Sequence, residues 1–217
     1  MLLVICTLYC LPLALLLAAR GTTWYVAAKL LASTAFLAAA LGLAVAAGHT
    51  DRLLAALPAL LFCFAGDVAL AVYNRARKKA AMGAGMLLFA AGHVAFFGWM
   101  CTAQAFRPAD LLWPVPFALA LAGLLRLPGI TAKRQMRGAI LAYGFLVSLM
   151  FTKSLTVAAG QPSAAAWLFC VGAALLLVSD AIIVFLYFYK APGPAVHIAN
   201  LLTYYVGMLA VALSLWW

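Results

Sequence analysis

The chain has 217 residues, of which 69% are hydrophobic and 8% are charged, and its mean hydropathy is +1.15. A soluble domain has an apolar share of about 45–50%, so the composition excludes a soluble protein and predicts an all-α, polytopic membrane protein. The net charge is +10, but most of the basic residues lie in short connections between apolar runs. Topology explains this charge, and we expect no nucleic-acid partner.

Apolar runs between short polar connections predict a bundle of eight transmembrane helices, since each crossing needs about 20 apolar residues. In chain order, the expected spans cover residues 2–19, 22–47, 53–73, 80–104, 111–127, 138–158, 164–189 and 197–217. The first run has neither the basic n-region nor the cleavage site of a signal peptide, so we expect it to be a helix of the mature protein. Residues 1–217 are expected to form a single transmembrane domain.

The basic residues predict the orientation of the bundle. The connections after the first, third, fifth and seventh spans carry ten of the 14 Lys and Arg residues, namely Arg20, Arg75, Arg77, Lys78, Lys79, Arg126, Lys133, Arg134, Arg137 and Lys190. By the positive-inside rule these connections are cytoplasmic and both termini are non-cytoplasmic. The basic clusters could also hold anionic lipid headgroups. We expect the membrane to be the bacterial inner membrane, or the endoplasmic reticulum in a eukaryote.

The cysteines and histidines do not predict a metal site. An odd, scattered set of five cysteines gives no disulfide framework. Cys6 and Cys10 have helical spacing, which suits packing better than metal binding. Only His93 is expected in the middle of a span, and a zinc site would need distant histidines to converge. We therefore expect neither a metal nor a cofactor.

Two aspartates, Asp67 and Asp180, lie deep in apolar runs, whereas Asp51 and Asp110 lie in short connections; the chain contains no glutamate. An ionisable residue at the centre of a spanning helix costs about 2.5–3.5 kcal/mol and marks a site lined by protein or water. At 1.5 Å per residue, Asp67 lies about 12 Å and Asp180 about 15 Å from the nearest cytoplasmic basic residue. The two carboxyl groups are therefore expected at one level of the membrane.

Further polar residues are expected near this level and are predicted to support the site: Lys29, His93, Tyr143, Ser179, Asn200, Tyr204 and Tyr205. Gly66 and Ser179, which precede the two aspartates, are small enough to permit close helix approach or a hydrogen bond to the backbone. One interpretation without chemistry is a polar clamp in which Lys29 neutralises one aspartate. Two acids with one nearby lysine leave a surplus carboxyl group, which favours a functional site.

The order of these residues resembles the YhhN or lysoplasmalogenase family over nearly the whole chain. The resemblance rests on Lys29-Leu-Leu, the Phe-x-Gly-Asp from Phe64 to Asp67, Gly92-His93, Tyr143, Ser179-Asp180 and Tyr204-Tyr205. The chain departs from the family pattern in having Leu30 where proline is usual after the lysine. It also lacks the glutamine that is common after the two tyrosines.

The resemblance implies a hydrolase that cleaves the vinyl ether bond of a lysoplasmalogen, an alkenyl-glycerophosphoethanolamine or -choline. Protonation of the β-carbon gives an oxocarbenium ion that water captures, and two carboxyl groups suffice, as in glycosidases. We expect Asp180 to be the acid and Asp67 to be the carboxylate that faces the cation and water, although the residues leave this order open. The expected partners are the lysophospholipid substrate and membrane lipids, and the oligomeric state is left open.

Two other functions would also use a pair of aspartates within the membrane. Intramembrane aspartyl proteases need glycine at the position of Phe64, which disfavours that class. A proton-coupled transporter or a lipid-binding protein remains an alternative, because Asp67 and Asp180 lie in similar settings four spans apart, as a parallel repeat would place them. The small number of Gly and Pro breaks within the spans argues against transport helices.

Overall fold

A computed structural model describes residues 2–216 and shows eight α-helices, one short 3₁₀ helix and no strand in that range. The helices are α1 (Leu2–Ala18), α2 (Tyr25–Ala47), α3 (Thr50–Ala76), α4 (Lys79–Ala103), η1 (Pro108–Leu111), α5 (Val115–Leu124), α6 (Arg134–Gly160), α7 (Ala164–Phe188) and α8 (Pro194–Ser214). The expected all-α bundle of eight helices is confirmed.

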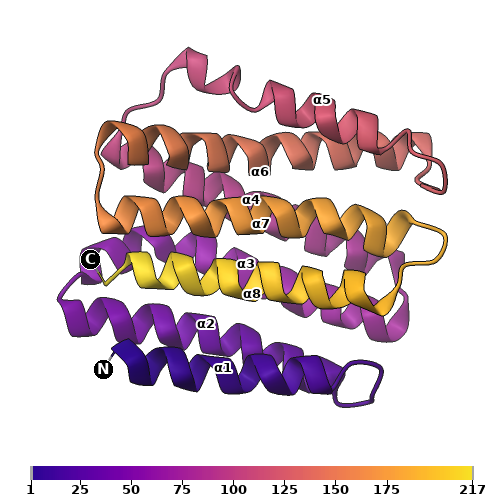
Figure 1. Cartoon of the computed structure of the whole chain (residues 1–217), viewed down its shortest axis with the longest axis horizontal. Helices are drawn as coiled ribbons and strands as arrows, with labels where there is room; N and C mark the ends of the chain where they lie inside the picture. The colour runs from indigo at the N-terminus through magenta and orange to yellow at the C-terminus, as the bar shows by residue number, and fades with distance from the viewer. Residues whose placement is uncertain (1, 217) are drawn as a thin grey trace.

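The helices run side by side with alternating direction (Figure 1). The chain enters and leaves at one end of the bundle, and the connections after α1, α3, α5 and α7 lie at the other end, which we call the basic end (Figure 1). The most extensive contacts are those of α7 with α8 and of α3 with α4; α2 also packs against α8, and α4 against α6. Helix α5 contacts α6 and lies at the outer edge of the bundle (Figure 1).

Six of the helices, α2, α3, α4, α6, α7 and α8, are long and apolar enough to cross a membrane, so the chain is an integral, multi-pass membrane protein. Helix α1 has 17 residues, a length of about 26 Å against a hydrocarbon core of about 30 Å. The segment Pro108–Leu124, which comprises η1, a turn and α5, is apolar and also shorter than the six spans.

The span expected over residues 111–127 needs correction, because α5 itself has only 10 residues. The first part of the expected span belongs to η1 and to the turn that leads to Pro114, the residue before the helix. Proline lacks the backbone N–H that a continuous helix would need there. The helix ends at Leu124, shortly before Pro128, where the chain turns toward α6.

Small residues bring the helices around the polar centre close together, as membrane helix packing requires. A Cβ atom on Gly66 of α3 would lie 2.8 Å from the ring of Phe89 in α4, so the close approach expected at Gly66 is confirmed. A Cβ atom on Gly172 of α7 would lie 2.8 Å from the carbonyl oxygen of Gly207 in α8. A larger residue at Gly66 would push α3, which carries Asp67, away from α4. A larger residue at Gly172 would push α7, which carries Asp180, away from α8.

Candidate functional site

Asp67 is enclosed by polar side chains from α2 and α8. Its side chain is 1% exposed, and the Lys29 ammonium lies 2.7 Å from Oδ1. The hydroxyl groups of Ser33 and Tyr204 donate hydrogen bonds to Oδ2 over 2.7 Å and 2.9 Å. The contact of Oδ1 with the Lys29 ammonium is an ion pair. The carboxylate charge is therefore compensated at short range.

Tyr205 completes this group, which we call the Asp67 cluster: Asp67, Lys29, Ser33, Tyr204 and Tyr205. The Tyr205 hydroxyl lies 2.9 Å from the Ser33 hydroxyl. The Lys29 ammonium lies 5.7 Å and 5.6 Å from the ring centroids of Tyr204 and Tyr205, within the range of cation–π attraction. The cluster corresponds to the clamp considered from the sequence, in which Lys29 neutralises one aspartate.

Asp180 belongs to a second group, the Asp180 triad, with His93 of α4 and Tyr143 of α6. The Tyr143 hydroxyl donates to Asp180 Oδ2 over 2.8 Å, and His93 Nε2 lies 3.1 Å from the same oxygen. Nε2 is also 3.1 Å from the Tyr143 hydroxyl, whereas Nδ1 has no hydrogen-bond partner among residues 2–216. A proton on Nε2 fits these contacts, since it lets the imidazole donate to the carboxyl group.

Two cavities meet at Asp180. The α5 cavity, of about 190 Å³, lies between α5, α6 and α7 and is lined by Asp180, Tyr143 and mostly apolar side chains that include Leu121 and Leu177. The α4 cavity, of about 60 Å³, shares Asp180 and Tyr143 and adds Phe89. The Asp180 side chain is 9% exposed, compared with 1% for Asp67. Asp180 is therefore the aspartate that borders space for a ligand.

Phe89 connects the two groups of residues. Its ring lies edge-on to the Tyr204 ring at a centroid distance of 5.8 Å, and it also lines the α4 cavity. Tyr204 in turn donates to Asp67. A change at Asp67 can therefore move the wall of a cavity that Asp67 itself does not line.

The residues expected from the sequence fall into three sets. Lys29, Tyr204 and Tyr205 gather around Asp67, and His93 and Tyr143 gather around Asp180. Ser179 and Asn200 form a third set that links α7 to α8. The Asn200 amide donates to the backbone oxygen of Ser179 over 3.0 Å and to its hydroxyl over 2.9 Å, and the Ser179 hydroxyl donates to the Asn200 backbone oxygen over 3.3 Å.

Ser33 was not among the residues predicted from the sequence, although its spacing from Lys29 could have indicated it. It lies four residues after Lys29 in α2, so both side chains lie on one face of the helix. A small hydroxyl one turn from a buried lysine is a natural partner for the carboxylate that the lysine meets.

A buried ion pair between Lys153 and Asp110 was also missed. Lys153 Nζ lies 2.8 Å from Asp110 Oδ2 and 3.0 Å from the backbone oxygen of Ala105. Asp110 lies in the connection between α4 and α5, as expected, but it is buried at 6% exposure because η1 packs against α6. Burial raises the pKa of the Asp110 carboxyl, but the hydrogen bonds from Lys153 and the Arg107 N–H outweigh burial and hold the pKa below its ordinary value.

Within residues 2–216, no group of three His, Cys, Asp or Glu side chains lies close enough together to hold a metal ion. The five cysteines are free thiols.

The fold and these contacts define a polytopic membrane protein with two aspartate-centred polar groups buried among its helices. A family model, that of the YhhN family, matches residues 5–215, and the chain belongs to this family. No curated protein and no solved structure matches the sequence.

Proposed function

We propose that the chain is a membrane-embedded hydrolase that cleaves the vinyl ether bond of lysoplasmalogens, giving a fatty aldehyde and a glycerophospho-alcohol. Membership of the YhhN family supports a hydrolase. The observation that carries the proposal is the position of Asp180, which lines two cavities of mainly apolar wall and has Tyr143 and His93 as hydrogen-bond partners. A single-chain lipid needs an apolar space of this kind beside the reacting group.

In the proposed reaction, Asp180 gives a proton to the β-carbon of the vinyl ether, and the positive charge moves to the adjoining carbon and oxygen. Water then adds to that carbon and gives its proton to the Asp180 carboxylate. The resulting hemiacetal breaks its bond to the glycerol oxygen, which takes up the hydroxyl proton, so the net change is the addition of one water molecule. Tyr143 and His93 orient the carboxyl group for both proton transfers.

We propose a positioning role for Asp67. The sequence suggested that this carboxylate faces the cation, but its burial and its contact with Lys29 favour a group that acts through its neighbours. One carboxyl group suffices for the reaction, because Asp180 is itself a carboxylate once it has given up its proton. Asp67 would hold Tyr204, and through it Phe89, at the wall of the α4 cavity.

The proposed place for the hydrocarbon chain is the α5 cavity. Its volume of about 190 Å³ is small for a lipid, since ligand pockets commonly have about 300–1,000 Å³. Helix α5 contacts α6 and lies at the edge of the bundle, so a chain that starts beside Asp180 would continue past α5 into the bilayer (Figure 1).

We also propose that the basic end faces the cytoplasm, in the bacterial inner membrane or the endoplasmic reticulum. The termini share the opposite end of the bundle (Figure 1), and ten of the 14 Lys and Arg residues lie in the connections at the basic end. A reporter fused to the C-terminus should therefore behave as non-cytoplasmic in protease-protection and labelling assays. A reporter found in the cytoplasm would show that the bundle has the opposite orientation.

Aldehyde release by the purified protein in detergent tests the proposed reaction. The substrates should be three lysophospholipids with the same headgroup and chain length, joined by a vinyl ether, a saturated ether or an ester. Aldehyde should appear from the vinyl ether alone. The Asp51→Asn variant, which changes an exposed aspartate at the start of α3, should keep full activity. Binding of the vinyl ether lipid without aldehyde release would instead indicate a transporter or a lipid-binding protein.

A further inference from the structure

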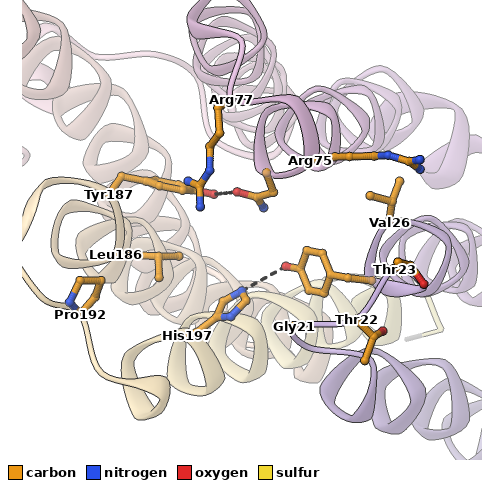
Figure 2. A pocket seen from close by; sticks show the side chains of 12 residues that line it. Gly21, Thr22, Thr23, Val26, Arg75, Arg77, Leu186, Tyr187, Pro192 and His197 are labelled. Carbon is orange, nitrogen blue, oxygen red and sulfur yellow. Dashed lines mark hydrogen bonds between the residues drawn. The ribbon is translucent and has the colours of Figure 1, made fainter.

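A third cavity, of about 540 Å³, lies at the basic end, and we call it the basic cavity (Figure 2). It is formed by the connection between α1 and α2 with the start of α2, the end of α3, the end of α7 and the start of α8. The lining residues are Gly21, Thr22, Thr23, Tyr25, Val26, Asn74, Arg75, Arg77, Leu186, Tyr187, Pro192 and His197. They include two arginines and no acidic residue, so the cavity favours an anion.

Four of the polar side chains that line the basic cavity are paired by hydrogen bonds. The Tyr187 hydroxyl donates to the Asn74 side-chain oxygen over 3.1 Å, and the Tyr25 hydroxyl lies 3.1 Å from His197 Nε2 (Figure 2). Figure 2 shows the Arg77 side chain extending from the end of α3 toward Tyr187. Guanidinium, hydroxyl and imidazole groups are the donors that proteins use to bind a phosphate group.

Arg77 is notable for its backbone as well as its charge. It directly follows the last residue of α3 and caps the helix, and its φ of 53° makes it the sole non-glycine residue with positive φ among residues 2–216. Helices that end in this left-handed conformation usually place glycine there, because a side chain adds strain. The chain thus keeps a guanidinium at a position where glycine would suit the backbone better. Strain of this kind is concentrated at functional sites.

Tyr187 joins the basic cavity to the space at Asp180. It lines both the basic cavity and the α4 cavity, and the α4 cavity shares Asp180 and Tyr143 with the α5 cavity. Asp180 precedes Tyr187 by seven residues in α7, which is about 10 Å along the helix. In a lysophospholipid, five bonds separate the phosphorus from the ether oxygen on the first glycerol carbon, an extended length of about 6 Å. Side-chain reach covers the remaining distance.

We propose that the basic cavity binds the phosphodiester of the lysophospholipid headgroup through Arg75 and Arg77, while the vinyl ether lies at Asp180. The glycerol backbone then passes Tyr187, and the hydrocarbon chain lies in the α5 cavity. This inference rests on the proposed function for its substrate. It adds a recognition site for the phosphate group, about one glycerol unit away from the reacting carboxyl group.

Kinetics with two substrates test this site. The substrates are an alkenyl-glycerophosphoethanolamine and the matching 1-alkenylglycerol, which has the same vinyl ether but no phosphate. The double variant Arg75→Gln/Arg77→Gln should raise KM for the phospholipid about tenfold, with kcat nearly unchanged and with unaltered kinetics on the alkenylglycerol. Arg134 is an exposed residue at the same end that does not line the cavity, so Arg134→Gln should leave the kinetics with both substrates unchanged. If the double arginine variant changes KM equally for both substrates, or for neither, the basic cavity is not the phosphate site.

Arg77→Gly separates loss of binding from loss of folding. It removes the guanidinium and relieves the left-handed backbone, so the protein should unfold at the same or a higher temperature while KM for the phospholipid rises. An unchanged KM in this variant would remove Arg77 from the site.

A binding measurement distinguishes failure of this site from failure of the proposed reaction. The probe is the saturated-ether lysophospholipid, compared with the matching alkylglycerol, and binding is measured by thermal shift on purified protein. The double arginine variant should bind the lysophospholipid about tenfold more weakly and the alkylglycerol equally well. This result without aldehyde release from any substrate would keep the phosphate site and reject the hydrolase. Equal lysophospholipid binding by both proteins would reject the site.

Free phosphate is a possible competitor for the same groups. Inorganic phosphate and glycerophosphoethanolamine, added separately, should displace the lysophospholipid only at concentrations far above its own, because neither has a chain to place in the α5 cavity. If inorganic phosphate raised the unfolding temperature of the wild-type protein as much as the lysophospholipid does, the cavity would be a site for free phosphate and not for a lipid headgroup.

Discussion

Asp67 and Asp180 are the same residue type at similar depth in two helices of the same orientation, yet their surroundings differ. Asp67 has a lysine and two hydroxyl groups as partners and is almost fully enclosed. Asp180 has a tyrosine and a histidine as partners and borders two cavities. The first arrangement neutralises a charge within the protein. The second leaves a carboxyl group at the wall of two cavities.

The role of a buried carboxyl group in a membrane protein depends on the groups that it contacts. An ion pair of the Asp67 kind stabilises a particular helix arrangement, and its loss leaves an uncompensated charge. A carboxyl group at a cavity wall, held by hydrogen bonds and without a lysine partner, can exchange a proton with a ligand. Substitutions at the two aspartates and at their partners should therefore have different effects.

The largest expected effect is that of Asp180→Asn on the reaction. An amide cannot give its proton to carbon, so aldehyde release should fall by a factor of about 10² to 10⁴. The variant should remain folded, because asparagine can still accept the hydrogen bond from Tyr143. The rate of aldehyde release and the thermal unfolding temperature should be measured beside Asp51→Asn. Full activity of Asp180→Asn would remove Asp180 from the mechanism.

Asp67→Asn should act mainly on stability. It leaves the Lys29 ammonium buried without a negative partner, and breaking a buried pair on one side costs about 3–5 kcal/mol. Aldehyde release per folded molecule should fall about tenfold, a smaller loss than that of Asp180→Asn, because the wall at Phe89 shifts.

The double variant Asp67→Asn/Lys29→Met provides the control for this prediction. It removes both charges, so thermal unfolding should return toward the wild-type temperature. If Asp67→Asn is as stable as the wild type and as inactive as Asp180→Asn, the two aspartates both react and the division of roles is wrong.

A matched pair of tyrosines gives the finest comparison. Tyr143 donates to Asp180 over 2.8 Å, and Tyr204 donates to Asp67 over 2.9 Å. Tyr143→Phe should lower kcat about tenfold with little change in stability, because the lost hydrogen bond orients the reacting carboxyl group. Tyr204→Phe should lower the free energy of unfolding by about 1 kcal/mol and leave kcat within about twofold. The reverse pattern would exchange the roles of the two aspartates.

Hydropathy, charge and depth allowed much of this arrangement to be predicted from the sequence. Apolar runs gave the helices, and the common level of Lys29 and Asp67 anticipated that they could meet. The segment before α5 was predicted less well, because a hydropathy window does not register that Pro114 prevents a continuous helix.

The partition of the polar residues could not be predicted, because depth along a helix does not give its rotation. Lys29 and His93 were both expected at or near the level of the aspartates, but the packing of α2 on α8 and of α4 on α6 directs them to different aspartates. The pairing of Lys153 with Asp110 depends on η1 folding back against α6, which a short polar connection does not reveal.

Hydrolysis in heavy water tests the central claim most directly, namely that a carboxyl group within the bilayer protonates carbon. The purified protein should be given the vinyl ether lysophospholipid in D₂O, and the aldehyde should be reduced to the alcohol as it forms, so that mass spectrometry can locate the isotope. A control aldehyde added to the same mixture without the lipid corrects for exchange. We predict a single deuterium at the second carbon of the chain in the wild-type product, with release about 10² to 10⁴ times slower in Asp180→Asn. A product without deuterium at that carbon, or labelling at the wild-type rate in Asp180→Asn, would contradict the account.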